Sequence, residues 1–146
     1  MLDRLKSEMK AAMKSRQKVR LGVIRLILSA TKQVEVDERI ELDDARVIAV
    51  LDKMLKQRRE SIKQYRDADR IDLAEVEEAE VLVIQDFLPK ALTEDEITEM
   101  VQAAITDSSA SSIKDMGKVM GIVRPAMIGR ADMAVVSTKI KALLGV

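Results

Sequence analysis

The chain has 146 residues, of which 47% are hydrophobic, 34% charged and 1% aromatic, and its formal net charge at pH 7 is zero. It contains no cysteine and no histidine. This excludes disulfides, thiolate nucleophiles, zinc sites with the usual ligands and imidazole acid–base chemistry. The apolar fraction argues against a disordered chain, and the many Ala, Leu and Met residues without strand-like alternation predict an all-α protein.

The N-terminal segment gives evidence about the compartment of the cell in which the protein is found. Residues 1–18 are too highly charged for the apolar centre of a secretory signal, and apolar runs such as 81–84 are far too short to cross a bilayer. A basic amphipathic start is also found in organelle-targeting segments, but Asp3 and Glu8 argue against that interpretation. Together with the absence of cysteine, which fits a reducing compartment, these features predict a cytoplasmic protein without a membrane partner.

Two amphipathic helices are expected at the start of the chain. Apolar residues recur at helical spacing over 2–13, and the other side of this helix carries a ladder of like charges at i, i+4 spacing, Lys6, Lys10 and Lys14. Such a ladder costs a few tenths of a kcal/mol per pair, so it either is solvated or serves a partner. A second helix, at about 17–36, has apolar residues on two sides and should be contacted from two directions.

A third helix is expected at about 44–68, capped by Asp43 or Asp44. Beside its apolar stripe runs a basic stripe with steps of three and four residues. The stripe consists of Lys56, Arg59, Lys63, Arg66 and Arg70. Arg58 falls within the apolar stripe instead, and a buried arginine needs a carboxylate partner. We therefore expect a structural ion pair between Arg58 and Glu80.

The fourth helix should begin directly after Asp72, its expected cap, with Ile71 and Val76 in hydrophobic-staple positions. It should end before Pro89, because the residue before a proline avoids helical angles. The next helix opens with a capping box at Thr93. This is the best domain boundary in the chain. We expect two small helical subdomains, at 1–90 with four helices and at 91–146 with three.

The C-terminal subdomain is expected to have helices at about 94–107, from Ser112 onward, and after a cap at Asp132. Gly117 and Gly121, four residues apart, are typical of close helix packing. Pro125 and Gly129 should form a corner between the last two helices, because proline fixes φ and glycine permits a left-handed backbone.

Charge is segregated along the chain despite its zero sum. Residues 1–32 hold nine basic and two acidic residues, whereas 72–86 hold six acidic residues and no basic one. A local field of this kind can steer a polyanion, although the blocks could also neutralise each other within a helical bundle. Only Tyr65 and Phe87 are available to stack on bases, so the expected mode is recognition of the shape and backbone of a folded RNA.

Catalytic chemistry has little support. There is no glycine-rich phosphate loop and no nucleophile beside a base. The acidic residues Glu75, Glu77, Glu78 and Glu80 point around most of a helix, which is typical of a solvated face and not of a metal site. We therefore expect no catalytic residues, no metal and no cofactor.

An ordered series of short segments extends over nearly the whole chain. The segments are LGVIR at 21–25, KQRRES at 56–61, ADRIDL at 68–73, FLP at 87–89, LTEDEI at 92–97, KDMGKVMG at 114–121 and GRAD at 129–132. In this series the chain resembles the GatB/YqeY family. It departs from the family pattern at Phe87, where Tyr is usual, and at Met133, where Gly is frequent.

The resemblance implies an all-helical protein whose C-terminal part is similar to the tail of the B subunit of the tRNA-dependent amidotransferase. That enzyme is a carbon–nitrogen ligase that takes its amide nitrogen from glutamine, and it catalyses in a domain that this chain lacks. The implied function is a tRNA-binding module without autonomous activity. Its expected phosphate contacts are Lys118, Arg124, Arg130, Lys139 and Lys141, with the Lys56–Arg70 stripe as a second surface. The alternatives are a module that docks an amidotransferase subunit or another translation protein, and a free-standing enzyme.

Overall fold

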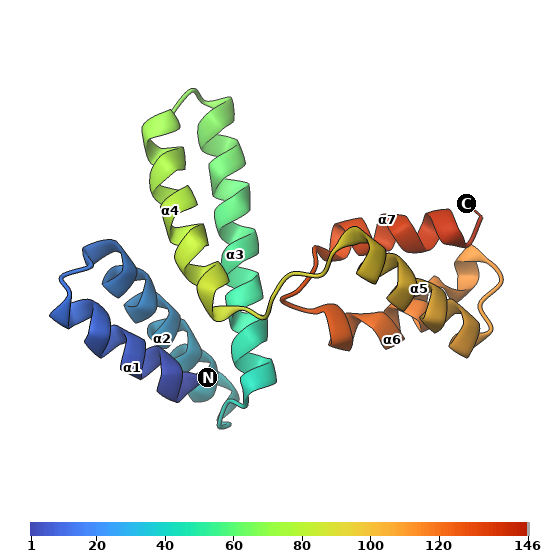
Figure 1. The fold of residues 1–146 in the computed structure, drawn as a ribbon, viewed down its shortest axis with the longest axis horizontal. Coiled ribbons are helices and arrows are strands. Elements are labelled where there is room, and N and C mark those ends of the chain that lie inside the picture. The colour runs from blue at the N-terminus through green and yellow to red at the C-terminus, as the bar shows by residue number, and fades with distance from the viewer. Residues whose placement is uncertain (146) are drawn as a thin grey trace. The chain divides into compact units, whose positions relative to one another are not determined.

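A computed structural model describes residues 1–145 of the chain. All of its regular structure is helical, with no strand between residues 1 and 145, which confirms the predicted all-α class. The helices are α1 (Leu2–Lys14), α2 (Lys18–Glu38), α3 (Asp44–Asp67), α4 (Ile71–Phe87), α5 (Glu94–Ser108), the 3-10 turn η1 (Ile113–Asp115), α6 (Met116–Met127) and α7 (Met133–Leu143) (Figure 1).

The chain divides into two compact units, Met1–Pro89 and Lys90–Val146, with four and three α-helices in their described parts. We call them the N-terminal and the C-terminal unit. Each unit buries its own apolar cluster. In the N-terminal unit, α1 pairs with α2 and α3 pairs with α4, so that the unit consists of two helical hairpins (Figure 1).

Three helices begin at the capping residues that the sequence predicts. The side chain of Asp43 accepts a hydrogen bond from the backbone N–H of Arg46 at 2.8 Å. Thr93 does the same for Glu96 at 3.2 Å, and Asp132 for Ala134 at 2.9 Å. The prediction for Asp72 is wrong, because α4 already starts at Ile71 and the carboxylate of Asp72 binds the neighbouring Arg70 instead.

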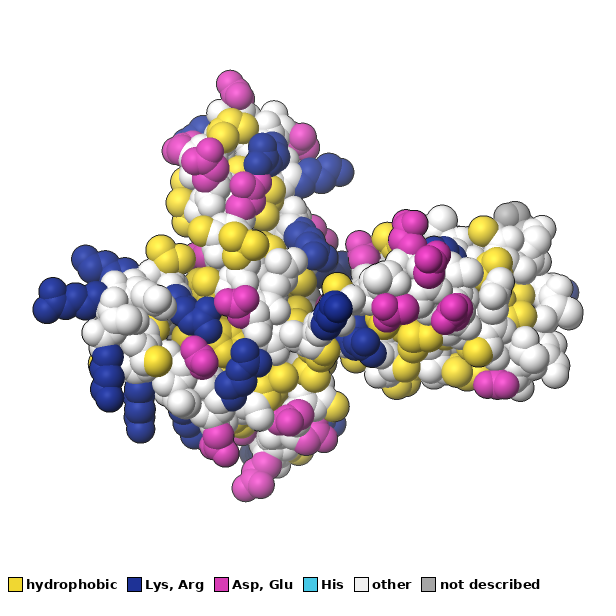
Figure 2. Space-filling view, viewed as in Figure 1, with side chains coloured by type: hydrophobic (Ala, Val, Ile, Leu, Met, Phe, Trp, Pro, Cys, Tyr) yellow, Lys and Arg dark blue, Asp and Glu magenta, His cyan; other side chains and the backbone are white. Residues whose placement is uncertain are grey.

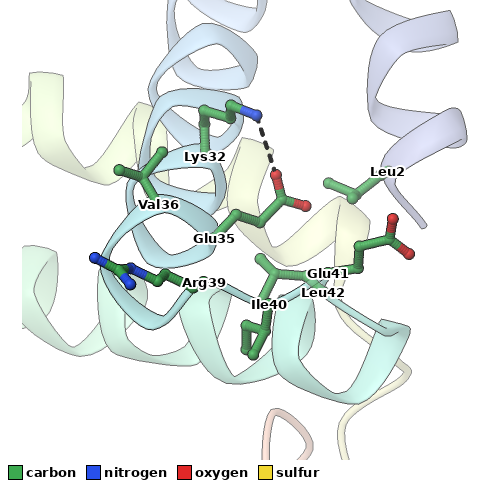
Figure 3. Close-up of a pocket in the computed structure, with 8 residues that line it drawn as sticks. All are labelled: Leu2, Lys32, Glu35, Val36, Arg39, Ile40, Glu41 and Leu42. Carbon is green, nitrogen blue, oxygen red and sulfur yellow. Dashed lines mark ion pairs between the residues drawn. The ribbon is translucent and has the colours of Figure 1, made fainter.

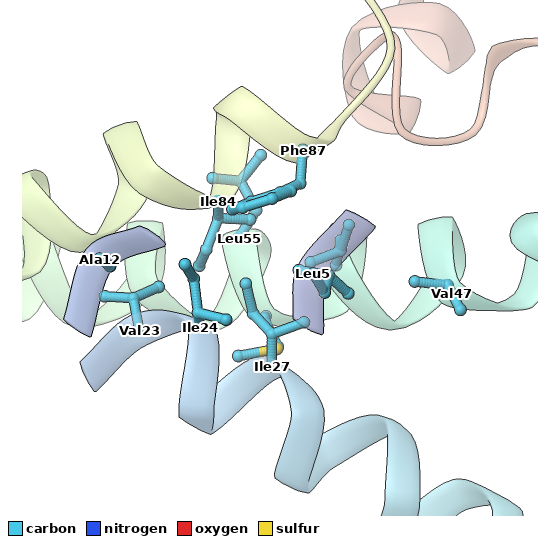
Figure 4. Close-up of a cluster of buried hydrophobic side chains, with 11 residues drawn as sticks. Leu5, Ala12, Val23, Ile24, Ile27, Val47, Leu55, Ile84 and Phe87 are labelled. Atoms are coloured by element: carbon cyan, nitrogen blue, oxygen red, sulfur yellow. The ribbon is translucent and has the colours of Figure 1, made fainter. Parts of the chain in front are cut away.

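All four helices contribute buried side chains to the core of the N-terminal unit, and Phe87 is its largest fully buried side chain (Figure 4). The guanidinium groups of Arg4 and Arg20 lie 4.9 and 5.2 Å from the centre of the Phe87 ring. Arg20 also donates to Asp86 at 2.8 Å and to Glu8 at 3.0 Å. One arginine thereby ties α1, α2 and α4 together. As predicted, α2 has neighbours on more than one side, since it contacts α1, α3 and α4.

The C-terminal unit packs α5, α6 and α7 around Val101, Val119, Val123, Met127 and Ile140, which are all nearly inaccessible to solvent. Because these residues of α6 and α7 face the core, the other sides of the two helices face the solvent.

The connection between α6 and α7 differs from the prediction. Pro125 lies inside α6, which continues to Met127, so the corner is formed without it. Gly129 does turn the chain, with a φ of 76° that a residue with a side chain adopts at a cost. Pro125 has no N–H to donate to the backbone carbonyl of Gly121. Both residues are exposed, so this carbonyl is open to solvent.

The predicted packing role of the α6 glycines is also wrong. Both Gly117 and Gly121 are exposed, and a methyl group added at either would meet no atom within 4 Å. The two glycines therefore leave a strip of helix backbone open to solvent. Arg124, seven residues after Gly117, lies at the end of the same strip.

Candidate nucleic-acid interface

Charge in the C-terminal unit is divided between its helices. The residues of α5 include five acids and no base, and Figure 2 shows acidic side chains gathered over this helix. From residue 116 to residue 145 the only acid is Asp132, and the bases in this part are Lys118, Arg124, Arg130, Lys139 and Lys141. No ion pair joins α5 to α6 or α7 among residues 1–145. The unit therefore carries most of its acids on α5 and its bases mainly on α6, on α7 and between them.

Three of the five predicted phosphate contacts, Lys118, Arg124 and Lys141, are exposed. Arg124 and Lys141 form no ion pair within the described part of the chain. Lys118 is 69% exposed and lies 3.6 Å from Asp115, one turn earlier on the chain. An ion pair of this kind is weak, and a phosphate could replace Asp115 at little cost.

The other two predicted contacts hold the unit together. Nε of Arg130 donates to the backbone carbonyl of Lys90 at 3.2 Å, and Nζ of Lys139 donates to that of Glu94 at 3.3 Å. Both side chains are half-buried. They fasten the α6–α7 connection and α7 to the start of the unit, so that Lys118, Arg124 and Lys141 are the better candidates for a ligand.

The basic stripe on α3 is divided in the same way. Arg66 binds Glu78 of α4, and Arg70 binds Asp72 at 3.2 Å. These hydrogen bonds raise the pKa of both arginines, and the bond from Arg70 lowers the pKa of Asp72. The remaining members Lys56, Arg59 and Lys63 are exposed and have no ion-pair partner among the described residues.

Arg58 and Glu80 are brought together as the sequence suggests. Nε of Arg58 donates to Oε2 of Glu80 at 2.9 Å, and a carboxylate oxygen of Glu77 lies 4.0 Å from the same nitrogen. The side chains of Arg58 and Glu80 are only 14% and 22% exposed. The pair joins α3 to α4 and is structural.

Neither a metal site nor a membrane-spanning helix is found among residues 1–145. No group of three or more His, Cys, Asp or Glu side chains there is placed to hold a metal ion. No helix in that range has both the length and the apolar character needed to span a membrane.

The structure also shows a groove that the sequence does not reveal. Figure 3 shows the residues around one hollow, of about 570 Å³, which is lined by Leu2, the C-terminal end of α2 and residues 39–42. A second hollow, of about 400 Å³, lies between α1 and α2 and shares Leu2, Lys32 and Glu35 with the first. Only the lysine ladder on α1 hints at this feature in the sequence.

Comparison with known proteins supplies the family. The family model described as Yqey-like protein matches residues 2–144. A protein of Pyrenophora tritici-repentis named "Altered inheritance of mitochondria protein 41, mitochondrial" is 33% identical over 99% of this chain and 81% of its own length. A protein of the same name from Meyerozyma guilliermondii is 31% identical, over 84% of this chain and 66% of its own. An uncharacterized protein of Schizosaccharomyces pombe is 37% identical, over 54% of this chain and 64% of its own.

These relatives correct the predicted location. Proteins that align with 84–99% of this chain are named mitochondrial, so the cytoplasmic prediction is wrong. The signals used for it were ambiguous. Absence of cysteine is compatible with several compartments, and α1 is charged because its outer side is exposed while Leu5 and Ala12 are buried. The match over residues 2–144 does confirm the family that the sequence segments suggested: the chain belongs to the YqeY-like family.

Proposed function

We propose that this protein is a non-catalytic tRNA-binding module related to glutamine-dependent tRNA amidation. The observation that carries the proposal is the basic part of the C-terminal unit, where Lys118, Arg124 and Lys141 are exposed in a region whose only acid is Asp132. Cations left free by the fold are what contact with a phosphate backbone requires.

The open backbone strip on α6 fits the same ligand. Gly117 and Gly121 present no side chain on this part of the helix, so a bulky polyanion can approach the surface beside Arg124 closely. The arginine can then hold a phosphate through two parallel N–H donors. Neither of the two aromatic residues of the chain lies on α6 or α7. This favours recognition of the backbone and shape of a folded RNA over reading of its bases.

The link to amidation rests on the resemblance of the C-terminal segments 114–121 and 129–132 to the tail of the amidotransferase B subunit. Those segments form η1, the first half of α6 and the corner that Gly129 turns. They contain Lys118 and flank Arg124 on both sides. The resembling segments thus overlap the basic part of the unit, which supports a shared ligand.

The test is a gel-shift or filter-binding titration of total tRNA with the full chain at several salt concentrations. Each phosphate contact should contribute about 0.7–0.9 to the slope of log affinity against log salt. The double variant Lys118→Ala/Arg124→Ala should bind more weakly and lose about 1.4–1.8 of that slope, because two contacts disappear.

A matched control removes the same charge elsewhere. Lys53 and Lys90 are exposed and lie outside the proposed surface, so Lys53→Ala/Lys90→Ala should leave affinity and slope nearly unchanged. Binding that does not depend on salt would refute the proposal, and so would an equal loss of affinity in the two double variants.

A further inference from the structure

One side of the α1–α2 hairpin packs against the end of α4. Glu8 of α1 and Arg20 of α2 face Asp86 at the end of α4, and on this side the hairpin packs into the core. On another side, α1 and α2 leave between them the hollow of about 400 Å³. Its floor consists of Leu2, Met9 and Leu28, which are half-buried and continuous with the core of the unit.

Both rims of this groove are basic. Lys6 and Lys10 line it from α1, and Lys32 lines it from α2. Lys14 continues the first rim at helical spacing, and Lys18 and Arg25 continue the second at steps of seven residues from Lys32. Figure 2 shows Lys and Arg side chains projecting from the hairpin.

Very little acid offsets these charges. Glu35 is the one acidic residue that lines the hollow, and it lies 3.6 Å from Lys32. Lys6, Lys10, Lys14, Lys18 and Arg25 form no ion pair among the described residues. The like charges on α1 at i, i+4 spacing repel one another, and an acidic ligand would relieve that repulsion.

We propose that the α1–α2 groove is a docking site for an acidic amphipathic helix of a partner protein. The apolar face of that helix would lie on Leu2, Met9 and Leu28, and carboxylates on its flanks would meet Lys6 and Lys10 on one side and Lys32 on the other. The residues of α1 that line the hollow run from Leu2 to Lys10 and span about 12 Å. Lys14 extends the basic rim by one turn, so a helical segment of about 13 residues would lie along both.

The shape of the site favours a helix over the two other anionic partners. A bilayer surface is flat and needs apolar side chains that protrude beyond the lysines, whereas Leu2, Met9 and Leu28 are half-buried and Lys6, Lys10 and Lys32 are exposed. A nucleic acid backbone needs the lysines but not an apolar floor. A convex rod with an apolar face uses both features.

The test is fluorescence anisotropy of the full chain with a labelled 14-residue synthetic peptide that carries leucines on one helical face and glutamates on its flanks. Two further peptides serve as comparison, one with lysines in place of the glutamates and one with the first sequence scrambled. The glutamate peptide should bind, more tightly at low salt, and the other two should bind at least about tenfold more weakly.

Matched variants locate the binding. Lys10→Glu/Lys32→Glu reverses one exposed charge on each rim and should weaken the glutamate peptide by about tenfold or more. Lys53→Glu/Lys63→Glu reverses two exposed charges on α3 and should change affinity less than about twofold. Arg124→Ala should not change the affinity for the peptide, because Arg124 belongs to the C-terminal unit. The peptide site and the proposed tRNA surface are therefore tested independently.

The proposal is overturned if the glutamate peptide does not bind at millimolar concentration, if the scrambled peptide binds equally well, or if both charge-reversal pairs weaken binding alike. It is also overturned if phosphatidylserine vesicles or total tRNA bind the chain and lose that binding with Lys10→Glu/Lys32→Glu while the peptide does not. In that case the groove would serve a lipid surface or a nucleic acid.

Discussion

The ion pair between Arg58 and Glu80 offers the sharpest test of how the α3–α4 hairpin is stabilised. Arg58→Met removes the cation but keeps much of the volume of the side chain, and it leaves the carboxylates of Glu80 and Glu77 together without a counter-charge. Glu80→Gln removes one carboxylate, and Glu77, 4.0 Å from Nε of Arg58, remains to compensate. The arginine variant should therefore be the more harmful of the two.

The exposure of the pair sets the magnitude. Breaking a fully buried pair costs about 3–5 kcal/mol, whereas an exposed pair contributes about 0–1 kcal/mol. With side chains 14% and 22% exposed, we expect Arg58→Met to lower the free energy of unfolding by about 2 kcal/mol and Glu80→Gln by about 1 kcal/mol. A domain of this size loses about 4–8 °C in Tm per kcal/mol.

The assay should report on the N-terminal unit alone, because two units can unfold separately. Tyr65 is the only tyrosine of a chain without tryptophan, and it lies half-buried on α3. Its fluorescence during urea titration therefore follows this hairpin. An unchanged midpoint in both single variants, or a greater loss from Glu80→Gln than from Arg58→Met, would refute the reasoning.

Three further predictions concern other parts of the chain. Gly117→Ala and Gly121→Ala should each raise the free energy of unfolding in a denaturant titration by about 0.5–1 kcal/mol, because both are open positions in α6. Gly129→Ala should lower it, because φ there is 76°, and a loss from the α6 variants would instead reveal hidden packing. Phe87→Leu should lower the Tm measured by calorimetry, with a loss of about 1–2 kcal/mol, since the ring is 1% exposed and stacks with two arginines. Hydrogen bonds from the backbone N–H groups of Ser111 and Ser112, with help from Lys118, lower the pKa of Asp115. A lowered carboxyl pKa gives stability that is present above the unfolded pKa and is lost as pH falls through the folded one, so the melting curves of Asp115→Asn and wild type should differ above about pH 5 and converge in strong acid.

Much of the fold could be predicted because it depends on local signals. Asp43, Thr93 and Asp132 cap helices through contacts two or three residues away, and such contacts are encoded in short segments. Apolar spacing is likewise a local signal: Val47, Leu51 and Leu55 recur every four residues and all three are buried.

The failures arise where distant parts of the chain decide the outcome. Val19 and Val76 lie at helical spacing from the buried Val23 and Ile84, four and eight residues later, yet they are 58% and 59% exposed because no other helix covers those positions. Gly117 and Gly121 look like packing residues, yet the neighbouring helices lie on the opposite side of α6. The groove between α1 and α2 could not be predicted either, since it depends on which side of the hairpin the rest of the unit leaves open.

The same distinction explains how a chain with zero net charge can have two basic surfaces. The ion pairs between helices are formed by arginines, such as Arg20 and Arg58, whose planar fork matches a carboxylate. Lys32 and Lys118 each form only one ion pair among residues 1–145, at 3.6 Å, with a carboxylate one helical turn away along the chain. Acids of the fold are thus neutralised mainly by arginine, which leaves the lysines of α1 and α6 without strong partners. Arg124, like these lysines, forms no strong ion pair within the described residues. Because its planar fork can hold a phosphate through two donors, it is the residue on which the proposed tRNA contact depends most.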